Sequence, residues 1–133
     1  MKNIIIFFAL AIIFITSCSW FLGVKKLGNK IYWDDKVIVL TKNDEYDGVG
    51  IIMVPPQIKK VAKNENYIII LTLNGANEKK YWLIDKTIES KMLDEVRADS
   101  NYWTYYKFSN VFGPLDSADF LNLKMQKKVE LDW

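Results

Sequence analysis

The segment YIIILTLN, residues 67–74, most restricts what this chain can fold into, because it is apolar at nearly every position and rich in β-branched side chains. This composition is typical of a strand that is covered on both faces. Shorter strand-like runs lie on either side of it. They are KVIVLT (36–41), VGIIMV (49–54), IKKVAKN (58–64) and KKYWLID (79–85). Short strands that follow one another with tight turns predict an antiparallel β-meander.

Four turn signals separate these strands. Asp47-Gly48 is a pair favoured in two-residue hairpins. Pro55-Pro56 ends the run before it, because proline cannot donate a hydrogen bond to a strand ladder. Asn64-Glu65-Asn66 and residues 75–78 contain the small polar residues and glycine that turns prefer. The meander is therefore expected to reverse at each of these positions.

Helical spacing appears only in the second half of the chain. In KTIESKMLDEVRAD, residues 86–99, apolar residues recur near every fourth position, and Thr87 could cap the N-terminus. A C-terminal helix is expected after Gly113-Pro114-Leu115, with Asp116 as its cap and Asp119 near its positive end. The predicted fold class is α+β, a small antiparallel β-meander with one or two helices packed on it.

The N-terminus has the pattern of an export signal. Lys2 precedes an apolar stretch at residues 4–15, and Thr16 and Ser17 follow before Cys18. The residues ITSC resemble a bacterial lipobox, which implies a lipid on the Cys18 sulfur, cleavage before Cys18 and acylation of the new amino group. Two or more acyl chains hold a protein stably on a membrane. The expected partner is thus the lipid bilayer, at the cell membrane or outer membrane, with the domain outside the cytoplasm.

Two other interpretations of this end stay open. The apolar run that reaches Gly23 is long enough to remain as an uncleaved membrane-spanning helix, or Cys18 could be an ordinary buried thiol. With the lipobox interpretation, the chain divides into a signal peptide at 1–17, a lipidated tether at 18–30 and a single β-rich domain at 31–133. The tether is expected because residues 19–30 mix glycine with lysine and show no period of two.

Composition excludes several classes of function. Loss of Lys2 with the signal reduces the 18 basic side chains to 17, against 16 acidic ones, so net charge gives no argument for nucleic acid or an anionic membrane surface. The chain has no histidine and one cysteine, which excludes an internal disulfide, histidine-based triads and most zinc or copper sites. The acidic segment 43–48 fails as an EF-hand because Val54 stands where a bidentate glutamate is required. We expect no metal, no cofactor and no nucleic-acid partner.

Three segments in combination resemble an uncharacterised family of small bacterial lipoproteins, known only as a domain of unknown function. They are GIIMVPPQIKKVAKNENYIIILT, KYWLID and VFGPLDSADF, and the resemblance covers roughly residues 36–125. It implies a secreted or lipid-anchored location and a β-rich domain with a C-terminal helix. It supplies no catalytic residues. The chain departs from the commoner pattern by the long segment 86–112 between the last two motifs.

Aromatic residues in NYWTYYKFSNVF, residues 101–112, form the candidate binding surface. Exposed rings of this kind stack on sugars or anchor a protein partner. The alternative is that they form the core of the inserted segment. The residues concerned are Tyr102, Trp103, Tyr105 and Tyr106.

The leading functional hypothesis is a membrane-anchored envelope lipoprotein, a non-enzymatic binding or accessory module that contacts another envelope protein or a wall polymer. The alternative is a carboxylate-dependent hydrolase acting on envelope polysaccharide or peptide. It would require two carboxylates that converge in one cleft, Asp85 with one of Asp34, Asp35 or Asp94. Asp85 at the end of YWLID could instead be a turn-forming residue.

Overall fold

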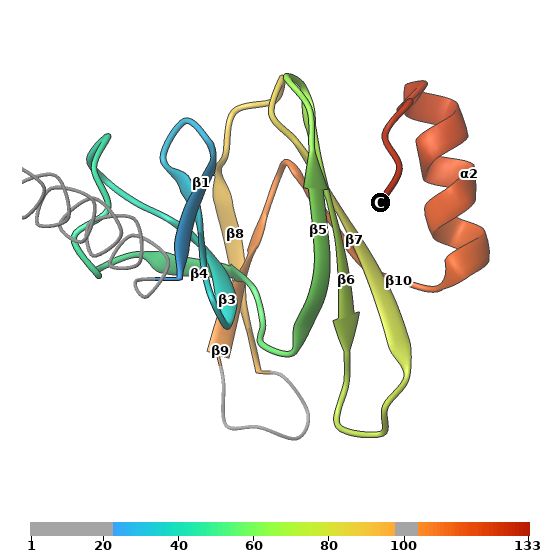
Figure 1. The fold of residues 1–133 in the computed structure, drawn as a ribbon, viewed down its shortest axis with the longest axis horizontal. Helices are drawn as coiled ribbons and strands as arrows, with labels where there is room; N and C mark the ends of the chain where they lie inside the picture. The colour runs from blue at the N-terminus through green and yellow to red at the C-terminus, as the bar shows by residue number, and fades with distance from the viewer. Residues whose placement is uncertain (1–22, 98–103) are drawn as a thin grey trace, which may run out of the picture.

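The described part of the chain forms two four-stranded antiparallel sheets and a two-stranded hairpin, with a helix outside them (Figure 1). The computed structural model describes residues 23–97 and 104–133. The strands are β1 (Val24–Gly28), β2 (Ile31–Asp34), β3 (Val37–Leu40), β4 (Ile51–Val54), β5 (Ile58–Lys63), β6 (Tyr67–Leu73), β7 (Lys79–Asp85), β8 (Met92–Arg97), β9 (Thr104–Phe108) and β10 (Val111–Leu115). The helix α2 spans Ser117–Lys127. This arrangement confirms the predicted antiparallel, β-rich α+β class.

The two sheets face each other as layers. The first sheet has the order β1-β2-β3-β4, and the second has the order β10-β7-β6-β5. The β8–β9 hairpin forms a third, separate pair, and β9 lies next to β4 (Figure 1). Helix α2 covers the face of the second sheet that points away from the first. Consecutive strands form a meander within each sheet, and the two sheets together make a sandwich.

The main core lies between the two sheets. Its buried members come from both sheets and from the β8–β9 hairpin, and they are Leu27, Ile31, Ile38, Met53, Val54, Ile68, Ile70, Trp82, Ile84, Tyr105 and Phe108. Strand side chains alternate between faces, so Ile69 and Leu83 point the other way, into a second cluster with Phe120 of α2. Strand β6 is therefore covered on both faces, which confirms the prediction from its unbroken apolar sequence.

The C-terminal helix begins where its capping residue predicts. The Asp116 carboxylate accepts a hydrogen bond from the Asp119 backbone N–H at 2.8 Å, which satisfies one of the donors that a helix N-terminus leaves unpaired. Helix α2 buries Phe120, whose ring stacks on Tyr81 with centroids 5.0 Å apart. The segment before the helix, Gly113-Pro114-Leu115, lies inside β10, where Leu115 pairs with Tyr81 of β7.

Part of the expected tether belongs to the folded domain. Residues Val24–Gly28 form β1, which pairs with β2, and Leu27 is only 4 % exposed. The tether boundary at residue 30 is therefore wrong, because the domain begins no later than Val24. Leu27 is the buried residue of this edge strand, and the two lysines before it are exposed. One buried position in five residues is too few to show the alternation of apolar and polar residues that indicates a strand. Cys18 and the predicted signal peptide at 1–17 lie outside the described residues.

Two local predictions in the strand and helix assignment are also wrong. The described part of the expected helix, residues 86–97, does not form one: β8 pairs antiparallel with β9, and its Met92 and Leu93 side chains are exposed rather than covering a sheet. Their helical spacing was coincidental, because the ladder that joins Val96 to Tyr105 determines the local structure. Asp47-Gly48 does not form a two-residue hairpin either, since the longer loop 41–50 connects β3 to β4.

Candidate functional site

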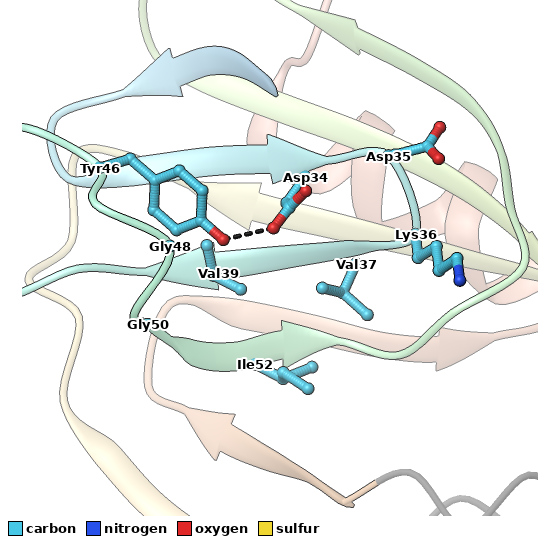
Figure 2. Close-up of a pocket in the computed structure, with 9 residues that line it drawn as sticks. All are labelled: Asp34, Asp35, Lys36, Val37, Val39, Tyr46, Gly48, Gly50 and Ile52. Carbon is cyan, nitrogen blue, oxygen red and sulfur yellow. Dashed lines mark hydrogen bonds between the residues drawn. The ribbon is translucent and has the colours of Figure 1, made fainter. Parts of the chain in front are cut away.

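A groove of about 420 Å³ lies on the outer face of the first sheet, the face that points away from the main core (Figure 2). We call it the Tyr46 groove. It lies between β2, β3, β4 and the loop 41–50, and its lining residues are Asp34, Asp35, Lys36, Val37, Val39, Tyr46, Gly48, Gly50 and Ile52. The alternation of β3 places Ile38 in the main core and sends Val37 and Val39 outward. The groove consequently has an aliphatic floor.

The loop 41–50 is held over this floor by two tyrosines. The rings of Tyr32 and Tyr46 stack with centroids 5.4 Å apart, and the Tyr46 hydroxyl donates a hydrogen bond to the Asp34 carboxylate. The Tyr32 hydroxyl donates to the backbone carbonyl of Asp44 in the same loop. Gly50 brings the returning chain so close to β3 that a Cβ atom there would lie 2.9 Å from Cβ of Val39. These contacts shape the groove from residues distant in sequence.

The groove has an acidic rim. Asp34 and Asp35 follow each other at the turn after β2, and Figure 2 shows Asp35 and Lys36 at the end of the groove away from Tyr46. Burial, together with the hydrogen bond to Asp34 and the negative charges of Asp34 and Asp47, raises the pKa of Tyr46 to about 12. Tyr46 therefore keeps its proton at physiological pH and acts as a hydrogen-bond donor to a charged carboxylate.

The structure separates the residues of the predicted aromatic surface. Tyr105 is buried between the sheets, where its ring meets Trp82 edge to face at 5.6 Å. Tyr106 is partly buried and packs against the same core. The core interpretation of this segment therefore holds for Tyr105, whose ring is not available to a partner. Tyr102 and Trp103 lie outside the described residues.

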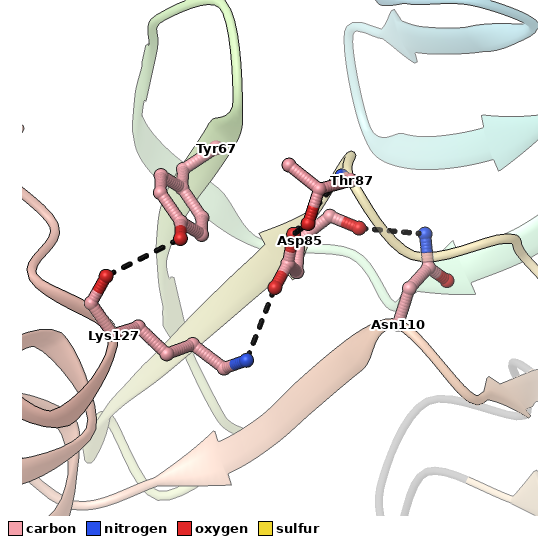
Figure 3. Close-up of polar contacts among 5 residues, drawn as sticks. All are labelled: Tyr67, Asp85, Thr87, Asn110 and Lys127. Carbon is pink, nitrogen blue, oxygen red and sulfur yellow. Dashed lines mark hydrogen bonds and ion pairs between the residues drawn. The ribbon is translucent and has the colours of Figure 1, made fainter.

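Asp85 lies at a different place, in a buried polar cluster at the end of β7 (Figure 3). One carboxylate oxygen accepts hydrogen bonds from the Thr87 backbone N–H at 3.0 Å and from the Thr87 hydroxyl at 2.5 Å. The other oxygen lies 3.0 Å from the Lys127 ammonium of α2. The side-chain amide of Asn110 donates to the Asp85 backbone carbonyl at 3.3 Å. The turn-forming interpretation of Asp85 is therefore confirmed, and the residue also ties the helix to the sheet.

The acidic residues of the hydrolase hypothesis do not converge around Asp85. Asp34 and Asp35 line the Tyr46 groove, whose lining includes neither Asp85 nor Asp94. Asp94 is exposed on β8. Burial alone would raise the pKa of Asp85, but its hydrogen bonds with Thr87 and Lys127 outweigh this and lower the pKa below its ordinary value. Asp85 is thus a charged structural residue rather than a proton donor in a cleft.

Sequence reasoning overlooked Tyr46, because it considered the surrounding NDEYDG segment as a calcium-binding loop and excluded it. The available signal was VIVL at residues 37–40, whose apolar side chains leave β3 without a polar face. Such a strand in a two-layer sandwich requires a cover on its outer side. The aromatic residue nearest to it in the following loop was the natural candidate.

Comparison with known proteins identified no relative of this chain. A scan against models of protein families, a search of curated proteins and a search of solved structures each found no match. The resemblance to the small bacterial lipoproteins therefore stays a hypothesis based on the three sequence segments.

Proposed function

We propose that this chain is a lipid-anchored protein of the cell envelope, whose domain lies outside the cytoplasm and binds a partner without catalysing a reaction. The ITSC sequence supports the anchor at Cys18. The Tyr46 groove carries the binding part of the proposal, because it combines an aliphatic floor, an aromatic wall and an acidic rim. Within residues 23–97 and 104–133, no helix is long and apolar enough to cross a membrane.

The chemistry of the groove favours a segment of another envelope protein as its occupant. An aliphatic side chain would pack on Val39 and Ile52, while a neighbouring lysine or arginine would pair with Asp34 and Asp35. Beside the groove, Val49 is 74 % exposed and extends the apolar surface beyond the floor. A wall polymer would gain less, because a sugar chain does not supply both an aliphatic group and a cation at this spacing.

The groups in the groove favour binding over reaction. The Asp34 carboxylate already accepts the hydrogen bond of Tyr46, and the high pKa of Tyr46 makes its phenolate unavailable as a nucleophile. Asp34 and Asp35 are adjacent in sequence on one side of the groove, whereas glycoside hydrolysis uses carboxylates that face each other across the bond to be cleaved. The proposal is therefore a binding module rather than a hydrolase.

Site-specific photocrosslinking in the native envelope tests this proposal. A photoreactive phenylalanine analogue replaces Val49 beside the groove, and the same analogue replaces the exposed Lys79 as the matched control. We expect a protein adduct from position 49 alone, attached to a segment that contains lysine or arginine. The adduct should disappear when Val39→Asp or Asp34→Asn is added. Adducts with glycan, or identical adducts from both positions, would contradict the proposed partner.

The anchor is tested separately by the intact mass of the protein extracted from membranes. We expect a chain that begins at Cys18 and carries two or more acyl groups, and we expect Cys18→Ser to abolish the modification. An unmodified chain that still begins at Met1 would refute the anchor. It would not affect the crosslinking result, which tests the groove independently.

The link between Tyr46 and Asp34 gives a prediction of its own. Subtracting the phenol absorbance titration of Tyr46→Phe from that of the unaltered chain should isolate one tyrosine with a pKa of about 12. Asp34→Asn should move this pKa down toward the ordinary value of 10.0, because it removes the negative charge beside the phenol. Tyr46→Phe should also cost about 1 kcal/mol of stability through the lost hydrogen bond. An isolated transition that Asp34→Asn leaves in place would show that the two side chains do not interact.

A further inference from the structure

A second groove, of about 410 Å³, lies between the edge strands of the two sheets. We call it the lysine groove. Strand β1 ends the first sheet, and β5 ends the second. The residues that line the groove are Lys25, Lys26, Leu27, Trp33, Val61 and Lys63. Three of these six side chains are cationic, and none of them is a carboxylate.

The cations of this edge are held by neutral groups. The Lys63 ammonium donates a hydrogen bond to the Lys26 backbone carbonyl at 2.9 Å, and the Lys86 ammonium donates to the Leu27 carbonyl at 3.0 Å. The Lys25 ammonium lies 5.3 Å from the centroid of the Trp33 ring. These contacts place the charges at the groove without neutralising them.

Carboxylates neutralise other lysines of the protein. Among the described residues, ion pairs join Lys80, Lys124 and Lys127 to acidic side chains, and none of these pairs involves a lysine of the groove. Burial and the positive charge of Lys63 lower the pKa of Lys86, and they outweigh the opposing negative charge of Glu65. The near-zero net charge of the chain thus conceals a locally cationic edge.

Chain geometry places this edge near the proposed anchor. Gly23 lies five positions after Cys18, so the chain between them spans at most about 18 Å. Gly23 directly precedes β1, and its carbonyl accepts a hydrogen bond from the Asp35 backbone N–H at 3.1 Å. Lys25 and Lys26 follow within three residues, at about 3.3 Å per residue along the strand. A chain attached through Cys18 therefore keeps these lysines within a few nanometres of the bilayer.

We propose that the lysine groove binds the anionic headgroups of the bilayer that carries the Cys18 anchor. This inference rests on the proposed lipid attachment. Cationic side chains beside an indole ring suit the membrane interface, where phosphate groups meet the ends of the acyl chains. Alternation in β2 sends Trp33 toward the lysine groove and Asp34 toward the Tyr46 groove. Headgroup binding at this edge would leave the Tyr46 groove, on the outer face of the first sheet, available to a partner.

Lysine footprinting on the full-length chain in vesicles tests this proposal. The protein is reconstituted into phosphatidylcholine vesicles with or without phosphatidylglycerol, treated with a membrane-impermeant amine reagent and analysed by peptide mass spectrometry. We expect anionic lipid to reduce the reaction of Lys25 and Lys26 about fivefold, which is the factor that one lysine contributes near such a surface. Salt at about 0.5 M should restore the reaction by screening. The exposed Lys79 and Lys107 should react equally in both vesicles.

The double variant Lys25→Gln, Lys26→Gln should lose the protection of Lys63, while Lys79→Gln, Lys107→Gln should keep it. Equal reaction of the groove lysines in both kinds of vesicle would overturn the inference. Protection by soluble polyphosphate but not by phosphatidylglycerol would assign the groove to a phosphate polymer and would also overturn it. An acylated Cys18 without lysine protection refutes the groove alone, whereas an unmodified N-terminus with protection refutes only the anchor.

Discussion

Gly113→Ala should lower the free energy of unfolding by about 4 kcal/mol, through a left-handed backbone conformation and a steric clash that act together. Gly113 has a φ of +150°, which side-chain-bearing residues rarely adopt. A Cβ atom there would lie 2.6 Å from Cε3 of Trp82 and 2.9 Å from the Tyr81 carbonyl oxygen. Trp82 cannot move aside, because it is 2 % exposed and donates a hydrogen bond to the Thr72 hydroxyl at 3.0 Å.

Gly48→Ala is the matched control for this clash. Gly48 also has a positive φ, +92°, but a Cβ atom there would meet nothing within 4 Å. Only backbone strain remains, and we expect a cost of about 1 to 2 kcal/mol. Urea unfolding of both full-length variants, followed by near-ultraviolet circular dichroism, measures the difference. Equal costs for the two substitutions would show that the contact between β10 and Trp82 is looser than the structure indicates.

Asp85→Asn should cost about 3 kcal/mol at neutral pH, because it leaves the Lys127 ammonium beside the sheet without its counter-charge. The effect should depend on pH in a defined direction. The folded pKa of Asp85 lies below the ordinary value of 3.8, so its ionised form stabilises the fold fully above that value. This contribution is lost as the pH falls through the folded pKa. Stability of the variant should therefore fall less steeply in acid.

Unfolding curves measured between pH 2 and pH 7 would show this convergence of the two proteins in acid. Asp132→Asn serves as the control, because Asp132 pairs with Lys124 at 3.2 Å while its side chain is 95 % exposed. Water and salt screen such a pair, so its loss should leave the stability almost unchanged. A parallel offset of the Asp85→Asn curve at every pH would mean that the carboxylate contributes through packing rather than through its charge.

The central hairpin was the most predictable part of the fold. Strand β6 has a nearly continuous apolar sequence, and the Asn64 side chain forms the turn before it by accepting hydrogen bonds from the Asn66 and Tyr67 backbone N–H groups. Sequence pattern and local hydrogen bonding point to the same structure there. In β8 the sequence pattern and the structure disagree. Met92 and Leu93 have the spacing of an apolar helix face, but both side chains are exposed and pack on neither sheet.

The apolar sequence of β3 indicates that its outer side is covered, but the shape of neither groove could be predicted from the sequence, because each depends on pairing between segments that are separated along the chain. The Tyr46 groove requires the loop after β3 to fold back by twelve residues onto Asp34. The lysine groove brings Lys63 of β5 to the Lys26 carbonyl of β1, 37 residues away. Net charge and local composition do not contain this information. Composition could exclude only certain kinds of site, namely internal disulfides, histidine-based triads and most zinc or copper sites.

The lysine contacts across the two edge strands also have a mechanical consequence. With the proposed anchor at Cys18, any pull on the envelope would reach β1 first, and among the described residues β1 pairs only with β2. An edge strand held in that way could peel from its sheet. The ammonium groups of Lys63 and Lys86 hold the carbonyls of Lys26 and Leu27 from the second sheet. Tension applied to β1 would therefore be shared between both sheets, which would keep the strand nearest the proposed attachment point from separating from its sheet.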